Sequence, residues 1–359
     1  MSPETRHYLR PVHCIESPQQ HDGLTARLAG TMLWFSAVEL IIKDRTGVSR
    51  SIVPVSECDA LPEAARVIFA RLIAPRSPLQ LGHRTIRLDQ PQVMGILNVT
   101  PDSFSDGGKH GDDPDAVAAA GVAMAAAGAS IIDVGGESTR PGAKAVWEGD
   151  EIARVEPVIT RLAASGTAVS CDTRKAAVMQ AALHAGAGMI NDISALLYDD
   201  QALSVALASD CPIVLMHAPG SGSDPHKGAA YADVLFDVYD WLEQRIAAVE
   251  AAGVARARLL VDPGIGFGKS LSDNLVLINN LALFHGLGCP ILFGASRKRM
   301  IGALSNEAEA DARLGGSLFL AMKAVEQGAQ IIRVHDVPET VQAIQVWRGM
   351  RDAALTAIA

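Results

Sequence analysis

Polar or charged residues lie at the ends of eight short apolar segments in the later part of the chain. They are Asn98, Asp133, Asp172, Asn191, His217, Asp262, Ser296 with Lys298, and Arg333 with His335. Packing alone would favour aliphatic residues at these places, so carboxylates, amides and bases there indicate a small polar ligand. For a single residue, capping of the next helix is an equal alternative, as for Asp172 before Thr173. Capping does not account for the whole set.

The chemistry of these side chains narrows the class of ligand. Buried carboxylates such as Asp172 and Asp262 need hydrogen-bond donors, and the amino-amidine edge of a heterocycle offers two parallel N–H groups. The basic residues suited to phosphate groups or to a carboxylate are Arg140, Lys298, Arg333 and His335. A metal held among such groups would be a hard cation with oxygen ligands, which means Mg²⁺. No cluster of His and Cys in the sequence favours zinc.

Two loops after the first two apolar segments carry further polar residues. Residues 98–108 are polar with one aromatic residue, Phe104, and residues 135–142 are rich in glycine with one cation, Arg140. Loops of this kind over an active site commonly act as lids. Disordered connections are the alternative, but they leave the phenylalanine and the arginine unexplained.

The apolar segments themselves are expected to be parallel strands. Each is nearly all apolar rather than alternating, as in strands covered on both faces. The segments are Val93–Leu97, Ile131–Val134, Ala168–Cys171, Met189–Ile193, Ile213–Met216, Leu259–Val261, Ile291–Phe293 and Ile331–Val334. Helical sequence separates them, and eight such alternations predict a closed (β/α)8 TIM barrel. An open, doubly wound sheet is the alternative.

The ends of the predicted helices support this repeat. Glycine precedes the strand in the same phase three times, at Gly128, Gly186 and Gly328, where a left-handed conformation would end each helix. Asp113 followed by Pro114 is typical of a helix start. The longest helix is expected over residues 231–252, with an apolar stripe that faces the core.

Residues 1–78 do not follow this rhythm and are expected to form a small α/β extension to a barrel over residues 79–359. Strands are predicted at Met32–Phe35 and Val38–Ile42, and a helix at Leu61–Leu72. A linker at Pro75–Pro78 and a hairpin at Leu81–Leu88 would lead into the barrel. The extension contains no catalytic motif, and we expect it to dock on the barrel or on a second subunit.

The bulk properties exclude several classes of protein. A formal net charge of −9 argues against a nucleic-acid partner. No apolar run reaches the roughly 20 residues of a membrane span, and the first residues lack a signal-peptide pattern, so a cytoplasmic protein is expected. The five cysteines have neither metal-ligand nor redox spacing and are expected to be reduced thiols.

The chain resembles the dihydropteroate synthase family. The matching stretches are MGILNVTPDSFSDGG, IIDVGGESTRPGA, SCDTRK, MINDIS, IVLMH, LLVDPGIGFGK, FGASRKRMIG and IIRVHD, in the family's order from about residue 80 to 340. The resemblance implies condensation of 6-hydroxymethyl-7,8-dihydropterin pyrophosphate with p-aminobenzoate, giving 7,8-dihydropteroate and pyrophosphate. It also implies Mg²⁺, sulfonamide binding, a homodimer, and a dissociative reaction without a covalent nucleophile.

The resemblance assigns roles residue by residue. Pterin would be bound by Asp133, Asp172, Asn191, Ile193, Met216, Asp262, Phe267 and Lys298. Pyrophosphate would be bound by Asn98, Thr139, Arg140, Arg333 and His335, with Mg²⁺ on Asn98 and Asp106. p-Aminobenzoate would be bound by Phe104, Thr139, Arg140, Pro141, Phe267, Lys298 and Arg299. The catalytic residues implied are Asp106, Asp172, Lys298 and Arg333.

Three features depart from the family's commonest pattern. Arg299 stands where many members have serine, near the expected p-aminobenzoate carboxylate. Residues 218–227 replace a loop that usually contains methionine, and residues 1–78 match nothing in the family.

Two other functions fit parts of the pattern. A methyltetrahydrofolate-dependent corrinoid methyltransferase shares the barrel and the pterin-binding residues, but the two long loops and the Ser296-Arg297-Lys298 motif argue against it. A pterin-binding paralogue without activity would be expected to lack Asp172, Lys298 or Arg333, and all three are present.

Overall fold

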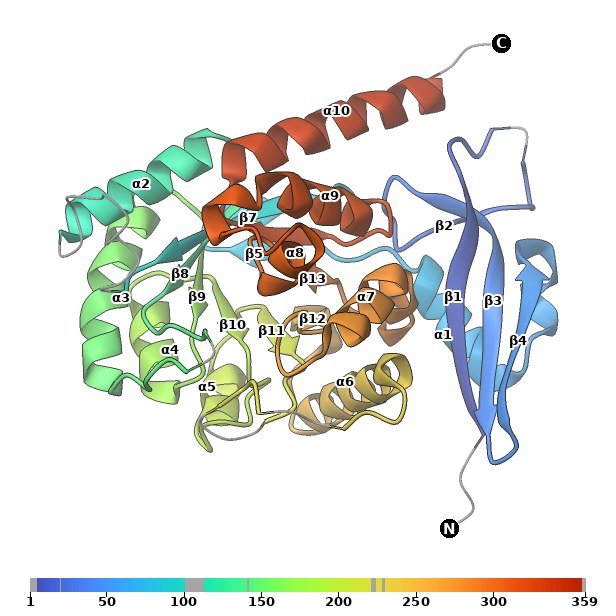
Figure 1. Cartoon of the computed structure of the whole chain (residues 1–359), viewed down its shortest axis with the longest axis horizontal. Coiled ribbons are helices and arrows are strands. Elements are labelled where there is room, and N and C mark those ends of the chain that lie inside the picture. The colour runs from blue at the N-terminus through green and yellow to red at the C-terminus, as the bar shows by residue number, and fades with distance from the viewer. Residues whose placement is uncertain are drawn as a thin grey trace.

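A parallel sheet of eight strands forms the centre of the larger part of the chain (Figure 1). The computed structural model describes residues 5–19, 21–100, 113–140, 142–220, 224–227 and 230–356. The strands are β7 (Gln92–Asn98), β8 (Ile131–Gly135), β9 (Val169–Asp172), β10 (Met189–Asp192), β11 (Ile213–Met216), β12 (Leu259–Asp262), β13 (Leu292–Phe293) and β14 (Ile331–Val334). A parallel bridge between Val261 and Ile291 joins the two ends of the sheet. The closed barrel predicted from the sequence is confirmed.

Helices connect the strands and surround the barrel (Figure 1). They are α2 (Pro114–Ala126), α3 (Glu148–Ala164), α4 (Ala176–His184), α5 (Ala202–Ala208), α6 (Val234–Ala251), α7 (Leu271–Asn279), α8 (Arg299–Leu304), α9 (Leu314–Val325) and α10 (Val337–Thr356). Short 3₁₀ helices lie at η3 (Arg256–Arg258), η4 (Leu281–Leu287) and η5 (Ala310–Ala312).

The predicted helix ends agree with the structure, with one correction. The Asp113 carboxylate accepts a hydrogen bond from the Asp115 amide at the start of α2, and Pro114 is the first helical residue. Gly128, Gly186 and Gly328 all have positive φ. The apolar stripe of α6 is buried, as expected. However, the longest helix is α10 with 20 residues, not α6 with 18. The sequence did not indicate this because few residues of α10 are buried, so its apolar periodicity is weak.

An apolar layer of side chains fills the barrel at its closed end. Strands β7 to β14 each place an apolar residue in or beside this layer, namely Met94, Ile131, Ala168 before β9, Met189, Val214, Leu260, Leu292 and Ile331. The hairpin of β5 (Leu79–Leu81) and β6 (Arg84–Ile86) adds three apolar residues to the same cluster, and Leu88 after β6 adds a fourth. A Cβ on Gly188, before β10, would lie 2.7 Å from the Leu81 Cα. The hairpin therefore covers the amino ends of the strands, which leaves the carboxyl ends for a ligand.

Residues 6–73 form an antiparallel sheet with one helix. The strands are β1 (Arg6–Ile15), β2 (Ala26–Arg27), β3 (Trp34–Asp44) and β4 (Gly47–Pro54), followed by η1 (Val55–Ala60) and α1 (Glu63–Ile73). The two predicted strands are one long strand, β3, and this part of the prediction was wrong. The helix was predicted to within two residues. β1 and β4 were not predicted, because basic residues and a proline break the pattern of β1 and because β4 is almost wholly exposed.

This sheet packs directly on the barrel helices, beside α6 (Figure 1). The fully buried ring of Tyr8 lies 4.6 Å from the Phe236 ring centroid and 5.3 Å from that of Tyr239. The Tyr8 hydroxyl donates to Asp240 at 3.0 Å, and Ile41 joins the main apolar cluster of the barrel. Since one cluster spans both parts, the division of the chain at residue 78 remains a prediction.

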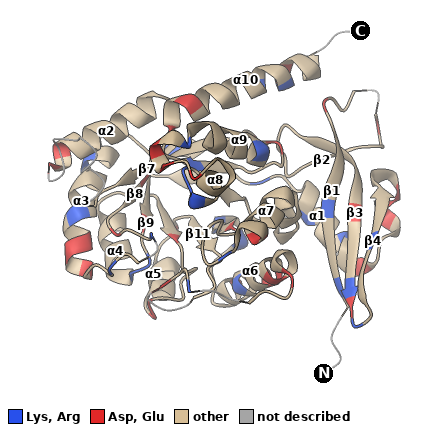
Figure 2. Cartoon of the chain, in the orientation of Figure 1, with Lys and Arg blue, Asp and Glu red and all other residues tan. Residues whose placement is uncertain are grey.

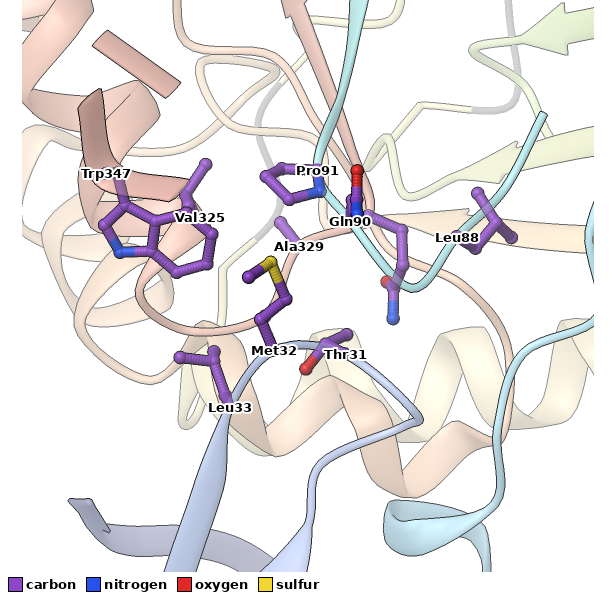
Figure 3. A pocket seen from close by; sticks show the side chains of 11 residues that line it. Thr31, Met32, Leu33, Leu88, Gln90, Pro91, Val325, Ala329 and Trp347 are labelled. Carbon is purple, nitrogen blue, oxygen red and sulfur yellow. The ribbon is translucent and has the colours of Figure 1, made fainter. Parts of the chain in front are cut away.

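A small apolar pocket lies where this sheet meets the barrel (Figure 3). Met32, Leu33, Val325 and Trp347 supply much of its wall. The pocket also borders Gln330, directly before β14, so it lies at the closed end of the barrel, away from the polar strand ends.

Among the described residues, no helix has the length and apolar character needed to cross a membrane.

We predict that Tyr8→Ala lowers the free energy of unfolding by about 3–5 kcal/mol, because it empties a buried aromatic site between sheet and barrel. Tyr8→Phe keeps the ring and loses only the hydrogen bond to Asp240, so it should cost about 1 kcal/mol. Urea unfolding measures both. A cost below about 1 kcal/mol for Tyr8→Ala would show that the two parts do not share a core.

Candidate active site

Arg333 is the centre of the polar network at the carboxyl ends of the strands. Its Nε donates to the Asp133 Oδ2 at 2.6 Å, and a terminal nitrogen donates to the Asp172 Oδ2 at 2.7 Å. The Asn191 Nδ2 donates to the same Asp133 oxygen at 2.9 Å. These four residues come from β14, β8, β9 and β10, and the structure brings them together as the sequence predicted.

Asp262 and Lys298 lie on the neighbouring side of the mouth. The Asp262 Oδ1 accepts a hydrogen bond from the Gly264 amide at 2.7 Å. The Lys298 Nζ donates to the Ile265 carbonyl and lies 4.7 Å from the Phe267 ring centroid. Gly266 has a φ of +83°, and a Cβ there would lie 2.9 Å from the Lys298 Cδ. Glycine is needed for the loop after β12 to turn so closely around the lysine.

An apolar wall stands beside these charges. Ile193, Met216, Ala218 and Phe267 form a separate buried cluster, at the ends of β10, β11 and β12. Three of the four were predicted to face the pterin, and the structure brings them into contact with one another. A flat wall beside a pair of carboxylates suits a planar heterocycle with polar edges.

Burial perturbs the ionisable groups of the site. It raises the pKa of Asp172 to about 7 despite the opposing charge of Arg333, and it raises the pKa of Asp262, where Lys298 opposes it. Burial also lowers the pKa of Lys298 to about 8, with Asp262 acting in the other direction. Burial alone would lower the pKa of Arg333, but Asp133 and Asp172 raise it above its usual value. Strongly shifted groups gathered at one end of a barrel are typical of an active site.

His335 differs from the expectation of a cation. Burial and the neighbouring Arg333 lower its pKa to about 4, so the imidazole is neutral near pH 7. Its Nδ1 lies 3.0 Å from the Ser296 Oγ, which also accepts from the His335 amide. His335 can therefore offer a hydrogen bond to an anion, whereas the positive charge at this place comes from Arg333.

The second loop is tied to the barrel through buried charges. Glu137 pairs with Arg174 at 3.2 Å and with Lys175 at 3.1 Å, and Lys175 pairs in turn with Glu151. Arg140, three residues further on, is exposed, and its charge acts on His335. Glu137, Arg174 and Lys175 lie within stretches that matched the family, but sequence alone did not indicate that they meet.

A second arrangement missed by sequence analysis fixes the loop after β12. The Lys269 Nζ lies 3.0 Å from the His217 Nδ1 and donates to the carbonyls of Gly264, Phe267 and His217. Burial lowers the pKa of Lys269 to about 7. His217 was expected at the rim, but its ring is buried against Trp241 and Lys269. Its contacts assign it to the support of the loop.

The remaining predicted residues are only partly placed. Asn98 ends β7, and its Oδ1 and the Asp172 Oδ2 would each lie 3.7 Å from a Cβ on Gly135. Arg299 begins α8 and is exposed. Phe104, Asp106 and Pro141 lie outside the described residues. Within the part that is described, no three His, Cys, Asp or Glu residues form a group able to hold a metal ion by themselves.

We predict that Arg333→Met destabilises the ligand-free protein by about 3 kcal/mol, because it leaves two carboxylates facing each other without a cation. Arg297→Met is a matched control, since Arg297 pairs with Asp336 at a more exposed place and should cost under about 1 kcal/mol. Adding Asp133→Asn to Arg333→Met should restore part of the loss in urea unfolding. Equal costs for the two arginines would contradict the central role of Arg333.

Comparison with known proteins identifies the family. A model of the family described as pterin binding enzyme matches residues 94–335. The chain is 47% identical to dihydropteroate synthase of Escherichia coli over 277 residues, which cover 77% of this chain and 95% of the relative. The corresponding enzyme of Bacillus subtilis is 43% identical over 259 residues, 72% of this chain and 88% of the relative.

Solved structures agree with this result. Xanthomonas albilineans dihydropteroate synthase with 4-aminobenzoic acid superposes with a TM-score of 0.73 at 46% identity, covering 79% of this chain and all of that one. The same species' enzyme with 7,8-dihydropteroate gives 0.70 at 43%, covering 79% and 100%. A Yersinia pestis enzyme with a sulfonamide drug complex gives 0.71 at 45%, covering 77% and 99%. The chain belongs to the dihydropteroate synthase family of pterin-binding enzymes.

Proposed function

We propose that this protein condenses 6-hydroxymethyl-7,8-dihydropterin pyrophosphate with p-aminobenzoate to give 7,8-dihydropteroate and pyrophosphate. The observation that carries the proposal is the arrangement of Arg333, Asp133, Asp172 and Asn191 beside the apolar wall that contains Phe267. This arrangement offers carboxylates to a heterocycle and a cation to its anionic substituent. The relatives with 4-aminobenzoic acid and with 7,8-dihydropteroate support one substrate and the product.

The pterin would lie on the strand ends. The carboxylates of Asp262 and Asp172 would accept from its amino-amidine edge, and Asn191, held by Asp133, would contact the ring. Lys298 would donate to a ring acceptor from its position above the loop after β12. Ile193 and Met216 would pack on one face of the ring.

The pyrophosphate would lie toward Arg333 and His335, with Asn98, Thr139 and Arg140 around it. Mg²⁺ fits this end, because the amide oxygen of Asn98 faces the same space over Gly135 as Asp172. Asp106 is the second ligand proposed. Mg²⁺ usually binds through one or two side chains plus phosphate oxygens and water, so a dedicated acidic cluster is not required. When bound, it would neutralise charge on the leaving pyrophosphate.

The p-aminobenzoate would bind over the mouth, between the loops and the apolar wall. Phe267 and Lys298 offer a ring face and a cation, and Thr139 and Arg140 approach from the second loop. Phe104 and Pro141 are proposed to complete the site. Arg299, exposed at the start of α8, is proposed to attract the carboxylate of this substrate.

The reaction requires no covalent intermediate with the protein. The carbon–oxygen bond to pyrophosphate breaks first, and the pyrophosphate takes the electron pair. The aniline nitrogen then forms the new carbon–nitrogen bond to the resulting pterin cation and loses a proton. Arg333 would stabilise the departing anion, and the carboxylates of Asp172 and Asp106 would stabilise the cation. Catalysis thus depends on electrostatic stabilisation and on holding the two substrates in line.

A homodimer and a cytoplasmic location remain proposals. Helices α9 and α10 are neighbours and expose large apolar side chains, among them Phe319 at 69%, Val346 at 61% and Met350 at 68%. Apolar surface of this kind is suited to burial against a second copy.

Figure 2 shows Lys and Arg intermixed with Asp and Glu along the chain, and we propose neither a nucleic-acid nor a membrane partner.

The proposed reaction is tested by detecting pyrophosphate from the dihydropterin pyrophosphate with and without p-aminobenzoate. We expect release that depends on p-aminobenzoate and yields dihydropteroate in equal amount. Release of pyrophosphate without formation of dihydropteroate, or no release at all, would contradict the proposal.

We predict that Asp262→Ala weakens pterin binding by about 2–4 kcal/mol, because the donors of the pterin edge lose their partner. Wild-type affinity should fall on acidification from near pH 7, because burial raises the pKa of Asp172 to about 7 and also raises that of Asp262, and protonation of either carboxyl removes an acceptor. Calorimetry over a pH series measures both effects. Asp89→Ala, near the surface at the closed end, is the control. Near wild-type affinity for Asp262→Ala would refute the assignment.

We predict that p-aminobenzoate binds weakly to the free enzyme and well only with pyrophosphate and Mg²⁺ present. Its site is built largely from loops, and ordering a loop costs roughly 1–2 kcal/mol per residue fixed. A ligand this small does not offset that cost, whereas pyrophosphate and Mg²⁺ tie the loop residues to the barrel mouth. By the same linkage, p-aminobenzoate must raise the affinity of the enzyme for pyrophosphate and Mg²⁺ by an equal factor. Equal affinities in calorimetric titrations with and without pyrophosphate and Mg²⁺ would show that the site is preformed.

A further inference from the structure

One histidine connects the second loop to the apolar wall of the site. The ring of His226 stacks on the ring of Phe267, with centroids 4.9 Å apart and an interplanar angle of 11°. Its Nε2 lies 2.6 Å from the Thr139 carbonyl oxygen and donates to it. His226 lies after β11, in the stretch that departs from the family's common sequence, so its position was not expected from the motifs.

The backbone around His226 is fixed by close contacts. The Asp224 carboxylate accepts from the His226 amide at 2.9 Å. A Cβ on Gly220 would lie 2.5 Å from the Asp224 carbonyl oxygen, and one on Gly268 would lie 3.3 Å from that of His226. Gly268 also has a φ of +57°. Since two glycines allow this approach, His226 is held against the loop that carries Phe267.

We propose that His226 is a positioning residue for p-aminobenzoate, which fixes the second loop at Thr139 relative to the wall at Phe267. This inference rests on the proposed function, because both connected residues are assigned to the p-aminobenzoate site. Thr139 precedes Arg140, so the same hydrogen bond also sets where that cation reaches the mouth. The pterin contacts of Asp262 and Asn191 belong to strand ends and do not involve His226.

The stacking also affects Phe267 itself. One ring is in contact with His226 and lies 4.7 Å from the Lys298 Nζ, so its rotation is restricted from two directions. Removing His226 would free both the second loop and the Phe267 ring. The cost would appear mainly in the binding of p-aminobenzoate, whereas the pterin would keep its hydrogen bonds to the strand-end residues and lose only packing against Phe267.

The test uses steady-state kinetics of the full-length protein. We expect His226→Ala to raise the KM for p-aminobenzoate about 10-fold, or about 1.4 kcal/mol, with kcat changed less than about 3-fold. Calorimetry with 6-hydroxymethylpterin should show a much smaller loss of affinity than for p-aminobenzoate, and retained binding also confirms that the variant is folded. Lys227→Ala alters the next, exposed residue and should leave all parameters as in wild type.

Two further variants separate the two contacts. His226→Phe keeps a ring for stacking and loses the donor to Thr139, whereas His226→Gln keeps a donor and loses the stacked ring. Each should raise the KM for p-aminobenzoate by less than His226→Ala. An unchanged KM in His226→Ala would overturn the proposal. A lower KM would also overturn it, because the histidine would then obstruct the face of Phe267 that the substrate uses.

Hydrogen exchange keeps this inference separate from the proposed reaction. The loss of the Thr139 contact in His226→Ala should speed amide exchange in residues 136–140 relative to wild type and Lys227→Ala. Wild-type protein that forms no dihydropteroate would contradict the proposed function, and the exchange rates would still report on the contact. Unchanged exchange rates in His226→Ala would overturn the positioning role.

Discussion

The rest of the site depends on one interaction, the pairing of the Arg333 guanidinium with both Asp133 and Asp172. Asp133 and Asp172 come from neighbouring strands, and burial makes two adjacent carboxylates costly unless a positive group lies between them. Arg333 supplies that group and leaves Asp133 able to hold Asn191. A substrate with donors on one edge and pyrophosphate on the other satisfies the same groups in a new combination. In the proposed complex the carboxylates would face the pterin, and the guanidinium would face the anion.

The barrel was predictable because each strand carries its own local signal. Segments such as Ile213–Met216 are wholly apolar, and the glycines at 128, 186 and 328 end the preceding helices in the same phase. Residues at the strand ends then follow from geometry, because parallel strands of a barrel bring their carboxyl ends to one mouth. Asp133, Asp172, Asn191 and Arg333 were therefore expected together before any contact was known.

What sequence could not indicate are contacts between segments that share no local pattern. Tyr8 is buried because α6 offers Phe236 and Tyr239, more than 200 residues further along the chain, and β1 alone has a mixed pattern broken by Pro11. The prediction that His335 is a cation was wrong, because burial and the charge of Arg333 lower its pKa. The pairing of Glu137 with Arg174 and Lys175, and of His226 with Thr139, likewise appears only when separate loops meet.

The site thus combines two kinds of support. Most of the groups proposed to bind pterin lie at the ends of strands that are hydrogen-bonded in a closed sheet, so a change there would disturb the barrel and the buried charges together. Most of the groups proposed to bind p-aminobenzoate lie in loops that a few contacts hold, such as Thr139 with His226 and Glu137 with Lys175. Substitutions in those loops can alter one substrate's affinity while the barrel stays intact. This explains why the departures at Arg299 and at residues 218–227 are compatible with an unchanged set of strand-end residues.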